Sequence, residues 1–152
     1  MIRLSDHVDP KRVLDLRSRT RDAALLELVE SLADAPEVQE REKLLQALIE
    51  REQLVSTGIG LGVAVPHAKI NAVTDFVVAY GRSQAGIAWG AIDDRPVHHV
   101  VLIAGPPDRQ HRYLQFLASV IAELKRPALR EALSAAKDTA ALCAVLRGAP
   151  PA

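Results

Sequence analysis

The sequence predicts an α/β fold, a single layered domain with a central mixed β-sheet and helices on both of its faces. Apolar residues recur at helical spacing early in the chain, strand-like apolar runs fill the middle, and helical spacing returns near the C-terminus. A block of strands between two blocks of helices favours layers packed around one sheet. The 152 residues are enough for one core. We assign the domain to residues 1–148 and a short tail to residues 149–152.

The N-terminal part of the chain is expected to form an edge strand and two helices. The strand is expected at residues 13–16, and Thr20 is placed to cap the first helix. Pro36 ends that helical region, and the second helix is expected over about residues 38–53. The apolar positions of the two helices are Leu25, Leu28, Val29 and Leu32, followed by Leu44, Leu45, Leu48 and Ile49.

The sheet is expected in the middle of the chain. Apolar runs predict strands at residues 62–65, 76–80 and 97–104, of which the last is the strongest. Residues 86–90 are expected to form a further short strand, and the turn signal at residues 93–96 precedes the strongest strand.

Three helices are expected after the sheet. The first has an apolar stripe, and Pro127 suits the first turn of the second, which packs Leu133. Asp138 is placed to cap the third helix, and Gly148 is placed to end it. The stripe of the first helix consists of Leu114, Leu117, Ile121 and Leu124.

The composition argues against several classes of protein. Nineteen basic and nineteen acidic residues give no net charge, which argues against a nucleic-acid partner. Cys143 is the single cysteine, so an intrachain disulfide and a four-cysteine zinc site are excluded. The sequence has neither an apolar run long enough for a membrane span nor the apolar segment of a signal peptide. We therefore expect a cytoplasmic protein without direct membrane insertion.

The histidines are the main candidates for chemistry. His98 and His99 are adjacent on an expected strand, so they point to opposite faces and cannot serve one site. The histidines lack the helical spacing of a metalloprotease, and no cysteine cluster assists them. We expect neither a metal site nor a cofactor.

His67 differs from the other histidines in its setting. It follows Pro66, which has no N–H and is expected to end strand pairing, so that His67 is displayed at a strand end. An imidazole there can act as a nucleophile, a general base or a metal ligand. The preceding loop carries Ser56 and Thr57, whose hydroxyls can cradle an anion together with backbone N–H groups. The residues alone leave open a plainer alternative, a strand-end histidine that hydrogen-bonds the backbone.

The segment around His67 resembles a known family. The pair Arg51-Glu52, the loop Ser56-Thr57-Gly58-Ile59-Gly60 and the run Gly62-Val63-Ala64-Val65-Pro66-His67-Ala68 together resemble the enzyme IIA domain of the fructose/mannitol type of the phosphotransferase system. This family includes the nitrogen-regulatory enzyme IIA proteins. The resemblance extends over essentially the whole chain, including the turn and strand start at residues 91–97 and the helices from Tyr113 onward.

The resemblance implies phosphocarrier chemistry without a metal. It implies that His67 accepts a phosphoryl group from the phosphocarrier HPr and passes it to an enzyme IIB, or uses its phosphorylation state as a signal. A guanidinium at Arg51 and the loop of Ser56 and Thr57 would stabilise the negative charge of the phosphohistidine. A backbone carbonyl bound to one ring nitrogen would leave the other ring nitrogen free as the nucleophile.

The sequence departs from the family pattern at one position. The family usually places a second histidine at the start of a C-terminal helix, directly before a leucine, and Tyr113 occupies that place here. His111 lies two residues earlier, and on a helix it would point about 200° away from Tyr113. A tyrosine hydroxyl can donate one hydrogen bond to a phosphate but supplies no positive charge near neutral pH. We expect Tyr113 and His111 to be candidate phosphate contacts.

Two functions follow from this resemblance. The first is a phosphocarrier with a regulatory role, a phosphotransferase component in which His67 accepts the phosphoryl group. The alternative is a non-catalytic sensor that binds a small anion or a nucleotide between His67 and Arg51 and regulates a partner such as a membrane transporter.

Overall fold

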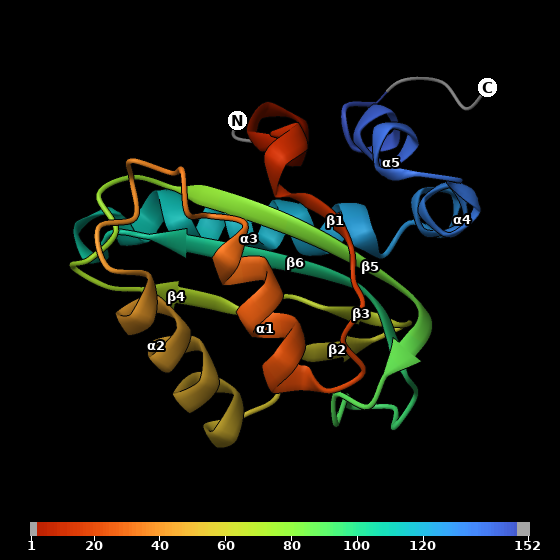
Figure 1. Cartoon of the computed structure of the whole chain (residues 1–152), viewed down its shortest axis with the longest axis horizontal. Helices are drawn as coiled ribbons and strands as arrows, with labels where there is room; N and C mark the ends of the chain where they lie inside the picture. Colours follow the sequence, from red (N-terminus) through yellow and green to blue (C-terminus); the bar gives the residue numbers. More distant parts are fainter. Residues whose placement is uncertain (1–2, 149–152) are drawn as a thin grey trace.

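A mixed sheet of six strands divides residues 3–148, the part of the chain described by the computed structural model, into two helical layers (Figure 1). The strand order is β1-β5-β6-β3-β2, and β4 also pairs with β6. Neighbouring strands are antiparallel in β5–β6 and β2–β3 and parallel in β1–β5, β3–β6 and β4–β6. The strands are β1 (Val13–Asp15), β2 (Gly58–Gly60), β3 (Val63–Ala64), β4 (His67–Lys69), β5 (Val77–Ile87) and β6 (Val97–Gly105). The tail expected at residues 149–152 lies outside the described residues.

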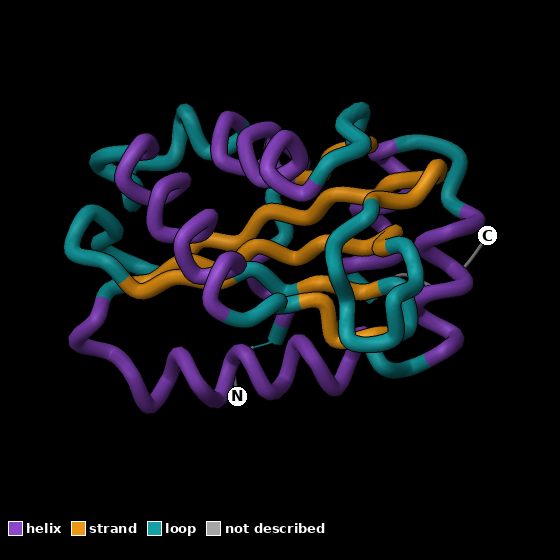
Figure 2. Tube along the Cα trace, turned by 90° about the horizontal axis from the view of Figure 1, so that it is seen from below, coloured by secondary structure: helices purple, strands orange, loops and turns teal. Residues whose placement is uncertain are grey.

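Helices cover both faces of this sheet, as the sequence predicted (Figure 2). One face carries α1 (Arg21–Glu30) and α2 (Arg41–Leu54). The other face carries α3 (Gln110–Leu124), α4 (Pro127–Ala135) and α5 (Thr139–Leu146), together with the short 3₁₀ helix η1 (Leu4–His7). Two further 3₁₀ turns are η2 (Pro10–Arg12) and η3 (Pro107–Arg109).

The central strand β6 supplies side chains to both cores. Val100 and Leu102 pack in the core beneath α1 and α2, whereas Val101 and Ile103 pack in the core beneath the C-terminal helices. This alternation follows from the two-residue repeat of a strand. All four side chains are fully buried, which explains why this apolar run gave the strongest strand signal.

Three of the helix starts that the sequence predicted are confirmed, those of α1, α4 and α5. The N–H of Ala23 donates to Oγ1 of Thr20 over 3.3 Å at the start of α1. At the start of α5, the N–H of Ala141 donates to Asp138 over 2.8 Å. Pro127 occupies the first turn of α4, where its missing N–H costs nothing. Local cap chemistry therefore sets these boundaries.

Two boundaries differ from the prediction because of contacts distant in sequence. Helix α2 begins at Arg41 rather than near residue 38. Val38 pairs with Val73 in an isolated antiparallel bridge, so the chain is still non-helical at that residue. The separate strand expected at residues 86–90 is the end of β5, which continues to Ile87 past an irregularity. Gly86 lies in that irregularity with φ +89°, a conformation that favours glycine.

The apolar stripe predicted for α3 is shifted by about one residue. Leu114 is 50% exposed and Leu117 is half-buried, whereas the fully buried positions are Tyr113, Phe116, Val120 and Leu124. Both sets recur at helical spacing, so periodicity alone could not select between them. The shift points Tyr113 into the protein.

The prediction that Pro66 ends strand pairing and leaves His67 at a strand end is only partly right, because β3 ends at Ala64 but pairing with β6 resumes at His67. Strand β4 starts at His67 and pairs with β6 in the same register as β3, since Val63 lies opposite His99 and His67 lies opposite Ile103. Pro66 cannot donate, but its carbonyl accepts from the N–H of Ile103 over 3.0 Å, so the ladder continues past it. His67 therefore stands at the start of a short paired strand.

Arg82 is a buried cation that sequence reasoning missed. Its side chain is 1% exposed and binds both carboxylate oxygens of Asp15, at 3.1 and 2.8 Å. The same guanidinium donates to the carbonyls of Leu133, over 2.9 Å, and Ala136 at the end of α4. Arg82 thus ties β5 to β1 and to the C-terminal layer.

Arg82→Met is expected to lower the free energy of unfolding by about 2 kcal/mol, because two buried carbonyls lose their donor. Arg109→Met is the matched control, since Arg109 pairs with Asp75 on the surface and is expected to contribute less than about 1 kcal/mol. Denaturant unfolding of both variants measures the difference. Equal losses in the two variants would contradict a structural role for the buried guanidinium.

Candidate active site

A pocket of about 380 Å³ lies between α2, β4 and α3, and His67 forms part of its wall. Helix α2 contributes Arg51, and α3 contributes Tyr113. The remaining lining residues are Ala47, Ala68, Lys69, Ile70, Leu114 and Leu117. Of the site residues predicted from the sequence, the pocket brings together His67, Arg51 and Tyr113, and leaves out Ser56, Thr57 and His111.

The backbone fixes the tautomer of His67. Its Nδ1 lies 2.7 Å from the carbonyl oxygen of Val65. Because a carbonyl only accepts, Nδ1 carries the proton and Nε2 keeps a lone pair. Nε2 takes part in no hydrogen bond among residues 3–148. The ring is therefore a neutral nucleophile with one nitrogen available.

Burial lowers the pKa of His67 below its ordinary value. The carbonyl of Val65 and the carboxyl group of Glu52 oppose this effect, whereas the positive charges of Arg51 and Lys69 add to it. The neutral form of the ring is therefore the dominant one at neutral pH, which is the form that can attack phosphorus.

Arg51 lies in the last turn of α2 and is half-buried beside the pocket. Within residues 3–148 it forms no salt bridge. A guanidinium without a carboxylate partner can bind an incoming anion through two parallel hydrogen bonds. Arg51 thus has the position and the free charge that its predicted role requires.

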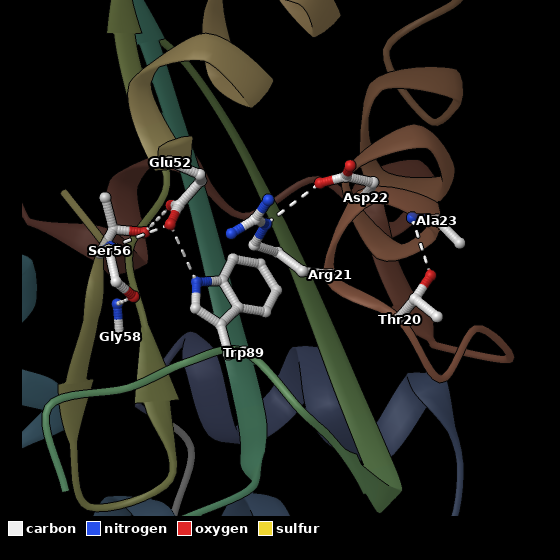
Figure 3. A network of polar contacts seen from close by, with 9 residues as sticks. Thr20, Arg21, Asp22, Ala23, Glu52, Ser56, Gly58 and Trp89 are labelled. Carbon is white, nitrogen blue, oxygen red and sulfur yellow. Dashed lines mark hydrogen bonds and ion pairs between the residues drawn. The ribbon is translucent and has the colours of Figure 1, made fainter. Parts of the chain in front are cut away.

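In the predicted anion-binding loop, the polar groups of Ser56 and Thr57 are already engaged in hydrogen bonds within the protein. Both the N–H of Thr57, at 3.0 Å, and its hydroxyl donate to the carboxyl group of Glu52, which is 3% exposed. The indole N–H of Trp89 donates to the same group over 3.2 Å (Figure 3). The hydroxyl of Ser56 accepts from the N–H of Gly58 over 3.0 Å. The polar groups of Thr57 therefore hold the loop against the end of α2, whereas the hydroxyl of Ser56 bonds within the loop.

Tyr113 and His111 both lie within α3 and point in different directions. Tyr113 is 2% exposed and its ring centroid lies 6.1 Å from that of His67, whereas His111 is exposed. The roughly 200° between positions two residues apart on a helix accounts for this difference. Of the two candidates, Tyr113 is the one beside His67.

Sequence reasoning missed Lys69, and it named Glu52 in the motif without giving it a role. Lys69 lies two residues after His67 on β4, a spacing that places both side chains on the same side of the strand. Its Nζ lies 5.3 Å from the centroid of the Tyr113 ring. Because side chains alternate between the two sides of a strand, the two-residue spacing from His67 could have predicted that Lys69 lies beside it. Nothing in the local sequence indicated that Glu52 would contact Trp89.

The fold and the pocket together define an α/β domain in which a histidine with one free ring nitrogen lies next to Arg51 and Lys69, neither of which forms a salt bridge within residues 3–148. Such an arrangement is suited to carrying a phosphoryl group. Residues 10–148 match the family described as phosphoenolpyruvate-dependent sugar phosphotransferase system, EIIA 2. The chain belongs to this family, as the resemblance predicted.

Relatives within the family point to two branches. The chain is 36% identical over 119 residues to a fructose-specific EIIA component of the phosphotransferase system from Haloferax volcanii, covering 78% of this chain and 77% of the relative. It is 30% identical over 150 residues to a nitrogen regulatory protein from Bradyrhizobium diazoefficiens, covering 98% and 97%. The crystal structure of the nitrogen regulatory protein IIA-Ntr from Neisseria meningitidis has the same fold, with a TM-score of 0.86, 22% identity and coverage of 94% and 98%.

Across residues 3–148, no helix combines the length and the apolar character needed to cross a membrane.

Proposed function

We propose that this protein is a phosphocarrier in which Nε2 of His67 accepts a phosphoryl group from HPr. The observation that carries the proposal is the 2.7 Å contact between Nδ1 and the carbonyl of Val65, which keeps the lone pair on Nε2 beside Arg51. An imidazole held in this tautomer needs no general base, because the attacking nitrogen carries no proton.

The proposed transfer balances without a metal. The lone pair of Nε2 attacks phosphorus and forms an N–P bond, while the bond between phosphorus and the donor atom of HPr breaks and its electron pair returns to that donor atom. The ring of His67 keeps its proton on Nδ1 and becomes formally cationic, and the carbonyl of Val65 faces that proton. Arg51 stabilises the negative charge on the phosphoryl oxygens, so catalysis consists of positioning and charge compensation.

The role of the modified protein is proposed to be regulatory. The alignment with the nitrogen regulatory protein from Bradyrhizobium diazoefficiens covers nearly the full length of both chains, which supports this role. The phosphorylation state of His67 would then control a partner protein, for example a membrane transporter. Transfer onward to an enzyme IIB is the other outcome, supported by the 36% identity to a fructose-specific EIIA component.

Incubation with enzyme I, HPr and radiolabelled phosphoenolpyruvate is expected to give a stoichiometric, acid-labile label on the wild-type protein. Peptide mapping at alkaline pH is expected to locate it on His67, because phosphoryl groups on imidazole survive alkali but not acid. The control omits HPr and is expected to remain unlabelled. Absence of label in the complete mixture, with HPr itself phosphorylated, would refute the proposal.

One observation favours a second candidate function. Tyr113 supplies no positive charge beside His67, because a protonated phenol is neutral. Burial raises the pKa of its hydroxyl and so keeps it in this neutral form. A pocket of this kind could bind a small anion or nucleotide without transferring it. In that case the complete mixture would leave the protein unlabelled, and titration with phosphate or a nucleotide would perturb the NMR signals of His67.

A further inference from the structure

Lys69 is a second cation in the His67 pocket. Strand β4 aligns Lys69 with Gly105 of β6 and His67 with Ile103, so both side chains project from the same side of β4. Both residues line the pocket, and within residues 3–148 Lys69 forms no salt bridge. Its ammonium group is therefore free to bind an anion beside the imidazole.

The ring of Tyr113 positions this ammonium group. Nζ of Lys69 lies 5.3 Å from the ring centroid, within the range of a cation–π contact. The Tyr113 ring stacks against Phe76 with centroids 6.2 Å apart and an interplanar angle of 22°. Gly105 makes room for this pair, because a Cβ there would lie 2.7 Å from Phe76 and 3.5 Å from Tyr113. The platform under Lys69 is therefore rigid and well packed.

The hydroxyl of Tyr113 is buried and has no hydrogen-bond partner among residues 3–148. A buried hydroxyl without a partner is unfavourable, typically by about 1–3 kcal/mol. Proteins tolerate such a group where a ligand completes the bond. The hydroxyl lies close enough to Arg51 for that charge to lower the tyrosine pKa, although burial outweighs the effect and raises it. The side chain is thus a fixed donor near the same cations.

We propose that Lys69, held over the ring of Tyr113, supplies the second positive charge to the phosphoryl group on His67, while the hydroxyl of Tyr113 donates a hydrogen bond to it. Lys69 and Tyr113 together thus supply the charge and the hydrogen bond that a histidine at position 113 would otherwise supply. This inference rests on the proposed phosphoryl transfer to His67. A phosphoryl group carries close to two negative charges, which Arg51 and Lys69 together neutralise.

The test compares Lys69→Met with Lys69→Arg in phosphoryl uptake from phosphorylated HPr. Lys69→Met keeps the apolar stem and removes the charge, so uptake is expected to slow roughly 10- to 100-fold. Lys69→Arg restores the charge and is expected to recover most of the rate. Lys125→Met, at an exposed position just after α3, is the matched control and is expected to keep the wild-type rate.

A second readout separates charge from packing. Arg51 and Lys69 lower the pKa of His67, Glu52 raises it, and the neutral Tyr113 contributes no charge. Removing the charge of Lys69 favours the imidazolium, so an NMR titration of Lys69→Met is expected to give a higher His67 pKa than the wild type. Lys69→Arg is expected to leave the His67 pKa near that of the wild type.

Tyr113→Phe tests the hydroxyl separately. The variant is expected to slow uptake about 5-fold, the effect of one neutral hydrogen bond. Its resistance to denaturant is expected to equal or exceed that of the wild type, because the hydroxyl it removes is unpaired. A residue with only a structural role would not change rate and stability in opposite directions.

The possible outcomes are distinguishable. If the wild type takes up label while Lys69→Met matches its rate and its His67 pKa, the role of Lys69 is refuted and the phosphocarrier function stands. If the wild type takes up no label, both fail together. If Lys69→Met is slow but Lys69→Arg is equally slow, the charge is not what matters and the inference is again overturned.

Discussion

Replacing His67 with alanine is expected to abolish phosphoryl uptake from phosphorylated HPr. The variant loses Nε2 of His67, the nitrogen of the pocket residues that carries a free lone pair, so the N–P bond cannot form there. Label per chain after a fixed time, measured at saturating phosphorylated HPr, is the relevant quantity. The fold is expected to survive, since His67 is half-buried and its side-chain hydrogen bond goes to a nearby backbone carbonyl.

His98 and His99 cannot take over this role. Both ring nitrogens of His99 are engaged, by Tyr80 at 2.8 Å and by Ser134 at 3.2 Å, and burial lowers its pKa to about 4. The ring of His98 contacts the carbonyl of Ser83 over 2.8 Å, away from the pocket residues. Neither has the combination of a free nitrogen and a neighbouring unpaired cation that His67 has.

His111→Ala is the matched control for this experiment. His111 is exposed on α3 and does not line the pocket, so the variant is expected to be labelled at the wild-type rate. Label that persists in His67→Ala would contradict His67 as the acceptor, whereas label that disappears in His111→Ala would contradict the exclusion of His111 from the site. The second of these results would also require α3 to rearrange in the complex with HPr.

The parts of the fold that could be predicted from the sequence are those that local chemistry determines. Thr20 and Asp138 cap helices with their own side chains, and Pro127 fits a first turn by its own ring geometry. The run at residues 97–104 is buried on both faces of the sheet, and its nearly continuous apolar sequence predicts such a strand. These features need no information about distant residues.

The features that could not be predicted depend on contacts across the fold. The ladder continues past Pro66 because β6 supplies a donor at Ile103, and α3 turns Tyr113 inward because that face meets Phe76. The site shows the same division. The motif located His67 and Arg51. It did not show that the N–H of Thr57 is bound to the carboxyl group of Glu52. Nor did it show that Lys69 lies over the ring of Tyr113, the contact on which its proposed role depends.

Glu52→Ala is expected to lower the free energy of unfolding by about 3–4 kcal/mol. The substitution leaves three buried donors unpaired: the N–H and the hydroxyl of Thr57 and the indole N–H of Trp89 (Figure 3). Each unpaired buried donor typically costs about 1–3 kcal/mol, part of which relaxation recovers. Denaturant unfolding measures the total loss. Because Trp89 is the single tryptophan, its indole N–H signal in NMR reports the local change.

Two variants separate the hydrogen-bond network from ordinary helix effects. Glu52→Gln keeps one acceptor oxygen and nearly the same shape, so its expected loss is smaller, about 1–2 kcal/mol. Glu50→Ala changes an exposed carboxylate on the same helix that interacts only with Gln46 among residues 3–148, and it is expected to cost less than about 0.5 kcal/mol. Stability is expected to rise in the order Glu52→Ala, Glu52→Gln and wild type. The indole proton of Trp89 is expected to exchange faster in both position-52 variants than in the wild type. A Glu52→Ala variant as stable as Glu50→Ala would show that water replaces the carboxyl group, and that the loop before His67 is held by its backbone pairing instead.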